Sequence, residues 1–388
     1  MSFLPLEPTI YKWISYDKIL EEETTTKLAL ACAGTLLMAW LLTSLVGFRS
    51  RKPGKGEGVS EKGQHENVDG SEENNFGYDV KVAKLLVHPI KFDRIWAVME
   101  ADSHLVITAR EYPKMVLITP TVQEDEHAPY GGILNITFPE DSGCPSLLIP
   151  LRPDEDLLKT WQPNQDVDMF KTFTVDGYIC QEVPGSRNGT HDPKMVSETF
   201  STYFGRPVHL IYKGSTPRPC LPSTNYPKLD ATAVYQDLYP LLFLSEEGMA
   251  EIDEETRSRV GTQKIEERWK TDKVVVERFR PNIVLRGGGA WVEDEWEEVT
   301  IGPDAQTAQN APRILVLGKC RRCVLPNVSP DTGVKDEAVP LKVIMKFRLG
   351  VDPNYKYHAC VGSWGAPLRE GVVNVGDSIF VRKKLRNV

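Results

Sequence analysis

A glycine-rich loop flanked by basic side chains is the segment of this chain best suited to binding an anion. Gly287 to Gly289 follow Arg286 directly, and Arg280 and Asn282 stand a few residues earlier. A glycine run lets backbone N–H groups approach an anion, and arginine offers paired donors to a phosphate or a carboxylate. The same pattern is typical of a glycine-rich hairpin with ordinary surface arginines. Both interpretations stay open on these residues alone.

Three cysteines further along the chain offer thiols for metal binding or nucleophilic chemistry. Cys320 and Cys323 have C-x-x-C spacing, but there is no second Cys/His pair at zinc-site spacing and no thioredoxin-like βαβ setting. Two small residues near a strand end are the simpler interpretation of this pair. Cys360 follows His358 closely. As a thiolate it would be a soft metal ligand; it could also be a nucleophile beside its histidine, or an inert cysteine.

The composition indicates a globular protein large enough for two domains. The chain has 388 residues, of which 41% are hydrophobic and 26% charged. A net charge of −8 argues against general nucleic-acid binding, which needs a basic surface. Seven cysteines at irregular spacing indicate free thiols in a reducing compartment rather than a disulfide framework. No GxSxG, Walker A, HExxH or Rossmann fingerprint occurs.

An uncharged apolar run near the N-terminus predicts a membrane anchor. Leu28 to Phe48 would span about 31 Å as a helix, which matches a bilayer core of about 30 Å. A signal peptide and a buried helix are the alternatives. Acidic residues precede the run and basic residues follow it, so the positive-inside rule places the C-terminal domains in the cytosol. We expect an N-terminal segment at 1–27, a transmembrane helix at 28–48 and a flexible linker at 49–79.

Short strand-like runs, punctuated by Gly, Pro, Asn and Asp, fill the rest of the chain. Residues 132–138 alternate at period two, as expected of a half-buried strand. A helix is expected over 192–204 with Asp192 as its N-cap, and another after the capping residue Ser245. The predicted fold class is α+β, mostly β: one N-terminal transmembrane helix, a smaller mixed sheet-rich domain at 80–215 and a β-barrel domain at 216–388.

Short motifs in a fixed order across residues 82–382 resemble those of one known family. The chain is similar to the amidoxime-reducing component family, in a fungal-type form, in which a MOSC N-terminal-like domain precedes a MOSC domain. The order and spacing of the motifs carry the resemblance. The matching pieces are His88-Pro89-Ile90-Lys91, Asp93-Arg94-Ile95-Trp96, Thr108-Ala109-Arg110, Tyr235-Gln236-Asp237, Phe279-Arg280-Pro281-Asn282, Cys320-x-x-Cys323, Asp331-Thr332-Gly333, Phe347-Arg348 and Val375-Gly376-Asp377.

The resemblance implies a molybdenum–molybdopterin cofactor held by basic side chains. In the family, the residues that match Lys91 and Arg94 bind the cofactor's phosphate, and those that match Arg280, Asn282 and Arg348 approach the cofactor. Lysine and arginine suit an anionic phosphate. This chain departs from the family in joining the motifs of Lys91 and Arg94 almost directly. We expect the basic side chains to converge on one pocket between the two domains.

The metal-binding thiol is a second departure. The resemblance places it just after the aromatic–Arg pair, where this chain has Leu349, Gly350 and Val351, none of which can ligate a metal. Cys360 is the nearest thiol. We therefore take Cys360 as the candidate metal ligand and catalytic residue.

The resemblance also implies a function. It predicts a reductase of N-hydroxylated compounds such as amidoximes and hydroxylamines, with cytochrome b5 and its reductase as electron donors. The implied location is the mitochondrial outer membrane, although the endoplasmic reticulum would satisfy the same charge pattern. A non-catalytic cofactor carrier or tethered interaction module is the alternative. A pyridoxal-phosphate sulfurase would need a separate large domain, for which this chain has no room.

Overall fold

The computed structural model describes residues 11–12, 76–86, 95–186 and 192–384. Two predicted cofactor-binding residues, Lys91 and Arg94, lie outside these ranges. The contacts reported below therefore concern the described part of the chain.

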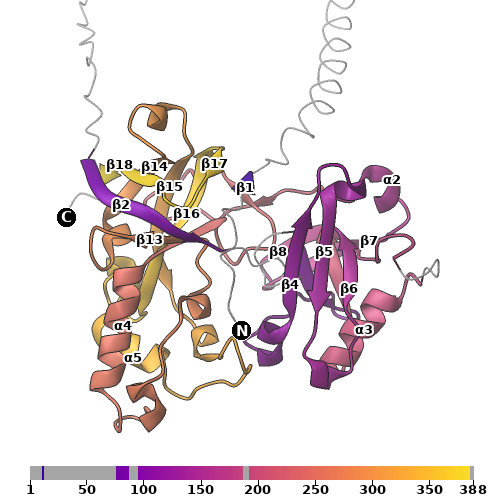
Figure 1. The fold of residues 1–388 in the computed structure, drawn as a ribbon, viewed down its shortest axis with the longest axis horizontal. Coiled ribbons are helices and arrows are strands. Elements are labelled where there is room, and N and C mark those ends of the chain that lie inside the picture. Colours follow the sequence, from indigo (N-terminus) through magenta and orange to yellow (C-terminus); the bar gives the residue numbers. More distant parts are fainter. Residues whose placement is uncertain (1–10, 13–75, 87–94, 187–191, 385–388) are drawn as a thin grey trace, which may run out of the picture. The chain divides into compact units, whose positions relative to one another are not determined.

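Seven of the described strands close into a barrel (Figure 1). Their order around it is β12-β13-β2-β18-β14-β15-β16, and every neighbouring pair is antiparallel except β12 and β13. Closure leaves no free sheet edge, so the short apolar strands are paired on both sides. The barrel strands are β2 (Phe76–Leu85), β12 (Leu241–Ser245), β13 (Ile283–Arg286), β14 (Trp296–Gly302), β15 (Arg313–Arg321), β16 (Cys360–Arg369) and β18 (Ser378–Lys384).

Strand β2 comes from the N-terminal side of the chain, yet it belongs to the barrel. It pairs with β13 and with β18, and Val80 and Val82 are buried. The domain bounds predicted from sequence place residues 80–85 in the first domain, at 80–215. Pairing between distant segments is not visible in a local pattern, which explains the different assignment. The predicted boundary between 80–215 and 216–388 stays a prediction.

The chain between β2 and β12 in sequence forms two further sheets. The order β3-β9-β8-β7 makes a four-stranded sheet, and β4-β5-β6 makes a three-stranded one. Phe200 of helix α3 and Leu210 of β9 are fully buried in their shared apolar core. A two-strand ladder, β10 with β11, follows these sheets in the chain. The bounds are β3 (Trp96–Glu100), β4 (Thr119–Glu124), β5 (Gly132–Thr137), β6 (Leu147–Pro150), β7 (Gln162–Met169), β8 (Phe173–Ile179), β9 (Val208–Lys213), β10 (Arg218–Pro219) and β11 (Thr232–Ala233).

The helices α3 and α4 lie where the sequence predicts them, but their N-termini are not capped by the predicted side-chain hydrogen bonds. Helix α3 (Met195–Phe204) begins three residues after Asp192, whose carboxylate accepts a hydrogen bond from Lys194 N at 2.8 Å. Ser245 is the N-cap residue of α4 (Glu246–Ser258), but its hydroxyl accepts from Trp291 N instead of from the helix. The remaining elements are α2 (Glu155–Leu158), α5 (Leu341–Phe347), β1 (Tyr11–Lys12), β17 (Val372–Val373), η1 (Pro113–Leu117), η2 (Pro129–Gly131), η3 (Glu140–Ser142), η4 (Glu267–Lys270), η5 (Val276–Phe279), η6 (Val292–Glu295), η7 (Thr307–Gln309), η8 (Leu325–Asn327) and η9 (Pro353–Tyr355).

The predicted fold class needs one correction. It included a transmembrane helix at 28–48, a segment that lies outside the described residues. No helix in the described part is both long and apolar enough to cross a bilayer. The described residues therefore form a mostly β fold around a closed barrel. The expected localisation, a single-pass membrane protein of the mitochondrial outer membrane or endoplasmic reticulum, is corrected on the same finding.

Candidate functional site

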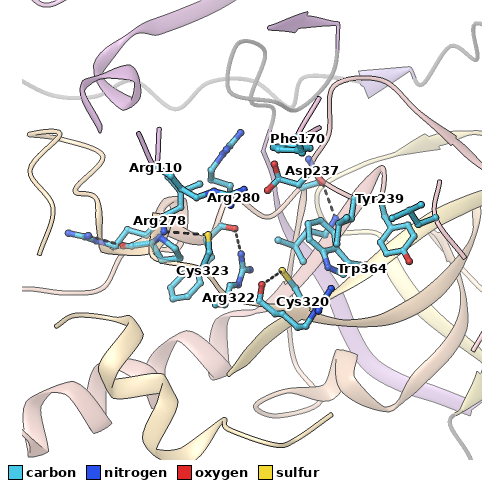
Figure 2. A pocket seen from close by; sticks show the side chains of 18 of the residues that line it. Arg110, Phe170, Asp237, Tyr239, Arg278, Arg280, Cys320, Arg322, Cys323 and Trp364 are labelled. Carbon is cyan, nitrogen blue, oxygen red and sulfur yellow. Dashed lines mark hydrogen bonds between the residues drawn. The ribbon is translucent and has the colours of Figure 1, made fainter. Parts of the chain in front are cut away.

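A cavity of about 320 Å³ is lined by arginines, cysteines, aromatic rings and one carboxylate (Figure 2). Residues of the β7–β8 turn line it together with the segment that enters β12, the loop after η5 and the end of β15. The lining residues are Arg110, Phe170, Thr172, Phe173, Leu221, Asp237, Leu238, Tyr239, Leu242, Arg278, Phe279, Arg280, Asn282, Cys320, Arg321, Arg322, Cys323, Leu325, Pro326 and Trp364.

The charge on the cavity wall is strongly unbalanced. Five of the lining residues are arginines, and Asp237 is the one carboxylate among them. Within the described part of the chain, no ion pair joins Arg110, Arg278, Arg321 or Arg322 to a carboxylate. Such a wall favours an anionic ligand, since arginine forms paired, charge-assisted hydrogen bonds to phosphate. We call Arg110, Arg278, Arg280 and Arg322 the arginine end of the cavity.

The loop after η5 places Arg280 and Asn282 on the wall. Arg280 ends η5 in the left-handed region, with φ 56° and ψ 47°, which few non-glycine residues adopt. Asn282 is buried and bonded through its Oδ1, which accepts from Leu242 N at 3.0 Å. Its Nδ2 has no partner in the described structure. A buried amide donor without a partner costs free energy, so it suits a cavity that receives a ligand acceptor.

Two further arginines are fixed by the backbone. Arg322 donates through Nε to Val361 O and through Nη1 to Phe279 O, both at 3.0 Å, while its buried Nη2 has no partner among described atoms. Arg278 donates through Nη1 to Pro326 O at 3.1 Å. Burial lowers the pKa of the Arg278 guanidinium. Backbone carbonyls thus hold both side chains in place, and each keeps one buried N–H donor, Arg278 Nε or Arg322 Nη2, without a partner among described atoms.

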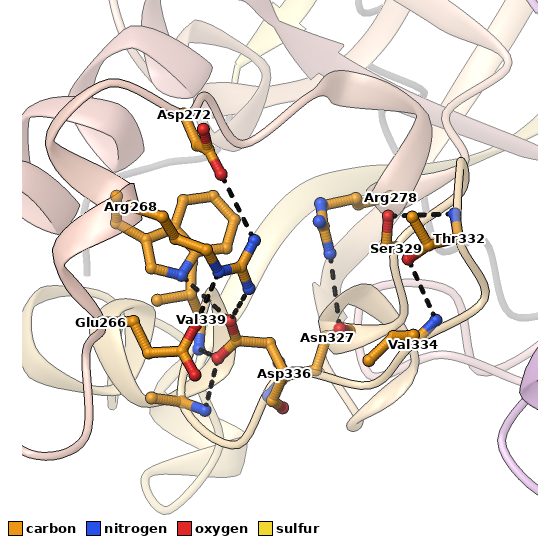
Figure 3. Close-up of polar contacts among 12 residues, drawn as sticks. Glu266, Arg268, Asp272, Arg278, Asn327, Ser329, Thr332, Val334, Asp336 and Val339 are labelled. Carbon is orange, nitrogen blue, oxygen red and sulfur yellow. Dashed lines mark hydrogen bonds and ion pairs between the residues drawn. The ribbon is translucent and has the colours of Figure 1, made fainter.

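A hub of hydrogen bonds on Asp336 holds the wall that Arg278 contacts (Figure 3). The carboxylate accepts from the N–H groups of Ala338 and Val339, each at 2.8 Å, from Trp269 Nε1 at 2.9 Å and from Arg268. Burial alone would raise the pKa of Asp336, but these hydrogen bonds hold it below its usual value. The loop that supplies Pro326 to the cavity is thereby fixed to η4.

The two cysteines of the C-x-x-C pair differ in environment. Cys320 is buried, and burial raises the pKa of its thiol to about 12. Cys323 is exposed on the cavity, and its sulfur accepts from Leu325 N at 3.5 Å. Cys323 is therefore the thiol at this site best placed to ligate a metal.

The glycine-rich loop does not form the anion site that its sequence allows. Arg286 forms an ion pair with Glu246 at 2.7 Å, and Gly287 N donates to Glu247 Oε1 at the same distance. A Cβ at residue 287, where φ is 91°, would lie 2.0 Å from Asp79 O. The glycine therefore serves close packing, and the hairpin interpretation accounts for the loop.

Two predicted site residues, Arg348 and Cys360, lie away from the cavity wall. Arg348 is buried, donates through Nε to Cys360 O at 2.9 Å, forms an ion pair with Asp294 and lies 4.0 Å from the Trp291 ring centre. Burial raises the pKa of the Cys360 thiol to about 11. Asp294 also accepts from Ser363 Oγ at 3.3 Å. We call Arg348, Asp294, Cys360 and Ser363 the barrel cluster.

The structure thus brings together only part of the predicted set. Arg280 and Asn282 meet on one wall, Arg348 and Cys360 meet in the barrel cluster, and the remaining two lie outside the described residues. The cavity adds residues that sequence reasoning did not select. Each of these belongs to or neighbours a motif, which was the available signal: Arg110, Asp237, Arg278, Arg322 and Cys323.

Comparisons with known proteins agree with this architecture. The MOSC N-terminal beta barrel domain family matches residues 77–207, and the MOSC domain family matches residues 231–380. The chain therefore is a MOSC-domain protein with the N-terminal domain that accompanies it.

Relatives place it more closely. The chain is 29% identical over 297 residues to "Mitochondrial amidoxime reducing component 2" of Homo sapiens and 27% identical over 298 residues to that of Rattus norvegicus. Each match covers 74% of this chain and 72% of the relative. The chain belongs to the family of the amidoxime-reducing components. The comparisons do not test the fungal-type assignment. Among solved structures, the YuaD protein of Bacillus subtilis matches with 15% identity, a TM-score of 0.22 and coverage of 43% of this chain and 75% of that one.

Proposed function

We propose that this chain is a molybdenum-cofactor-dependent reductase of N-hydroxylated compounds such as amidoximes and hydroxylamines. The observation that carries the proposal is the cavity with five arginines, a single carboxylate and an exposed thiol. The names of the relatives, amidoxime-reducing components, supply the substrate class. Arginines suit the phosphate of a metallopterin and a soft thiolate suits its metal. The side chains of the cavity wall therefore fit the cofactor that the family resemblance implies.

The residues at the arginine end fit the anionic part of such a cofactor. Asn282 Nδ2, Arg322 Nη2 and Arg278 Nε are buried donors without partners in the described structure. A phosphate offers the acceptors they lack, and each charged hydrogen bond contributes about 1.5–3 kcal/mol. Arg280 lies on the same cavity wall and adds positive charge to it. When bound, the cofactor would supply two-electron redox chemistry at molybdenum, and the chain would hold and orient it.

The thiol of this site is Cys323 in our proposal. Cys360 was the candidate from sequence, but it is fully buried, and its raised pKa of about 11 keeps it a neutral thiol at physiological pH. Metal ligation needs the thiolate. Cys323 is accessible on the wall that carries Arg280 and Arg322. Lys91 and Arg94 stay predictions as additional phosphate ligands.

Electrons must come from another protein in this proposal. The chain contains no flavin or nicotinamide fingerprint. The resemblance to the amidoxime-reducing components implies cytochrome b5 and its reductase as donors.

The test combines metal analysis with an assay. The full chain is purified, its molybdenum content is measured, and reduction of benzamidoxime is followed with cytochrome b5, its reductase and NADH. We expect about one molybdenum per chain and turnover that is lost in Cys323→Ser. Metal without turnover would replace the reductase by a cofactor carrier. A chain without molybdenum after expression in a cofactor-producing host would contradict both.

A further inference from the structure

A basic surface lies on helix α5 and on the loop that follows it. Within residues 338–369 the only side-chain carboxylate is that of Asp352, which is buried, although the whole chain has a net charge of −8. Glu337, just before this segment, is paired with a lysine outside it at 2.6 Å. Lys346 of α5 and Lys356 of the loop are exposed, and no ion pair in the described part of the chain joins either to a carboxylate. Positive charge is therefore concentrated here on an acidic protein.

Exposed apolar side chains accompany these lysines. Met345 is 43% exposed, Leu349 44% and Tyr357 89%. The neighbouring Val343 and Ile344 are fully buried, so α5 already uses one side for the apolar core. Met345 and Leu349 are four positions apart, which brings them together at the end of the helix. Apolar side chains that are exposed as a group and rimmed by polar residues mark interaction sites.

The backbone holds the loop after α5 in place. Leu349 and Ala359 form a β-bridge, and Gly350 N donates to His358 O at 3.4 Å. A Cβ at residue 350, where φ is 71°, would lie 3.3 Å from Lys356 O, so the two arms of the loop are in close contact. A surface that is already ordered loses little conformational entropy when a partner binds.

This surface continues to the rim of the cavity through Arg321. Arg321 is exposed and lines the cavity, and its guanidinium carbon lies 3.9 Å from the ring centre of Tyr355 in the loop. In the sheet Arg321 pairs with Cys360, the residue after Ala359. The ring of Tyr355 also packs edge to face with that of His358, with centres 6.2 Å apart. A molecule bound on the loop would therefore lie next to the cavity that we assign to the cofactor.

One surface thus combines positive charge, exposed apolar contact area and a position beside the cavity. We define the docking surface as Arg321, Met345, Lys346, Leu349, Lys356 and Tyr357. We propose that the docking surface binds an acidic electron-donor protein, one that presents a redox group ringed by carboxylates. The inference rests on the proposed function, which requires electrons from a second protein. Complementary charge steers such a partner, and interfaces of electron-transfer proteins are small, which suits one helix end and one loop.

The chemistry of the proposed reaction requires repeated docking. Reduction of one N–OH group to N–H breaks the N–O bond, forms an N–H bond, takes two electrons and two protons and releases water. A carrier of single electrons, such as a ferrous haem that becomes ferric, must therefore dock twice in each turnover. Exposed lysines suit this exchange, because charge at the rim of an interface raises the association rate more than the affinity.

A lipid surface is the other partner that lysines and apolar side chains attract, and α5 argues against it. A helix that lies in a membrane interface places its apolar face in the lipid. Helix α5 has only seven residues, and its apolar side, with Val343 and Ile344, is buried in the core. Tyr357, the most exposed large hydrophobic side chain of the docking surface, carries a polar hydroxyl. A protein partner therefore fits the docking surface better.

The experiment measures binding of the soluble haem domain of cytochrome b5 to the full chain by biolayer interferometry. At an ionic strength of about 20 mM, the double variant Lys346→Glu with Lys356→Glu should bind about tenfold or more weakly, because it reverses the steering charge. Lys194→Glu, the same change at an exposed lysine before α3, is the matched control and should bind like the wild type. Tyr357→Ala should weaken binding about threefold to tenfold by removing apolar contact. Wild-type binding should weaken about tenfold or more at about 500 mM salt, where exposed charges are screened.

A kinetic measurement separates docking from catalysis. Reduction of benzamidoxime is followed with reduced cytochrome b5 and, in parallel, with reduced methyl viologen, a small donor that needs no protein docking. The double variant should raise the KM for cytochrome b5 about tenfold or more. The viologen-driven rate and the KM for benzamidoxime should not change, because neither lysine lines the cavity.

Three results would overturn the inference. They are equal cytochrome affinity in the double variant and the wild type, wild-type affinity that does not fall with salt, and a double variant that loses binding to vesicles of equal parts phosphatidylserine and phosphatidylcholine but keeps its cytochrome affinity. The salt arm needs no variant, so it stands if the double variant fails to fold. A chain that reduces benzamidoxime with viologen but gives one of these results keeps the proposed function and loses only the docking surface. A chain that binds cytochrome b5 at the docking surface without turnover from either donor keeps the surface and loses the proposed function.

Discussion

The cavity and the barrel cluster contain the same kinds of side chain and differ in how fully those side chains are paired. In the barrel cluster, Arg348 has a carboxylate, a carbonyl and an aromatic ring as partners, and the Cys360 thiol is buried. In the cavity, arginines outnumber the single carboxylate, and Cys323 is exposed. Buried groups that are fully paired stabilise a fold, whereas donors without partners are available to a ligand. Residue type alone therefore does not tell a site from a structural cluster.

The largest expected effect is a loss of stability when Arg348 of the barrel cluster is replaced. Arg348→Ala leaves the mostly buried Asp294 carboxylate, 11% exposed, without its ion-pair partner, so the free energy of unfolding should fall by about 3–5 kcal/mol. Urea denaturation measures it. Lys346→Ala, an exposed change in helix α5, which ends just before Arg348, should alter the free energy of unfolding by less than about 0.5 kcal/mol. Equal unfolding midpoints for the two variants would show that the barrel cluster is not structural.

The second effect separates the thiols of the two regions. Iodoacetamide at pH 8 should modify Cys323 more than about 100-fold faster than Cys360, because Cys360 is buried and its pKa of about 11 leaves little thiolate at that pH. Mass spectrometry of the labelled peptides gives both rates from one sample. Faster labelling of Cys360 would reverse the assignment of the accessible thiol.

The third effect concerns anion binding. Arg280→Ala should weaken binding of inorganic phosphate about 10–100-fold, the effect of one charged hydrogen-bonded contact. Arg286→Ala is the matched control, since Arg286 is exposed and paired with Glu246 outside the cavity wall. Calorimetric titration of both variants with inorganic phosphate measures the two affinities. If the control loses as much affinity, the glycine-rich loop is the anion site after all.

The fourth effect is a pH dependence beside the barrel cluster. Glu293 is buried next to Asp294, and burial raises its pKa to about 7. The folded state then binds the proton more tightly than the unfolded state. This contribution to stability is fully present below the unfolded pKa and is lost as pH rises through about 7.

Glu293→Gln should remove that dependence. The unfolding free energy of the wild type, measured by urea denaturation, should fall between pH 5 and pH 7 relative to that of the variant, by up to about 1.4 kcal/mol per pH unit. Parallel curves for the two proteins would show that Glu293 does not titrate in this range.

Local sequence patterns predicted where strands and helices occur better than which segments they pair with in the fold. The alternation over 132–138 predicts β5, and the acidic first turn after Ser245 predicts α4, because both depend on neighbouring residues. Pairing of β2 with β18 joins residues about three hundred positions apart, which no local pattern contains. The hydroxyl of Ser245 likewise bonds to Trp291 instead of its own helix.

The site was predictable in part for the same reason. Arg280 and Asn282 share one loop with a motif, and the structure places both on the cavity wall. The C-x-x-C pair was interpreted as structural, because spacing says nothing about which thiol is exposed. Burial separates Cys320 from Cys323, and only folding determines burial.

The most direct test of the central claim is protection of Cys323 by the cofactor. The rate of iodoacetamide labelling is measured on the full chain loaded with molybdopterin cofactor and on the cofactor-free chain, with the partly buried Cys144 as internal reference. We predict that loading slows labelling of Cys323 by about 100-fold or more and leaves that of Cys144 unchanged. Equal labelling of Cys323 in the two preparations, with cofactor demonstrably bound, would place the cofactor elsewhere and contradict the account.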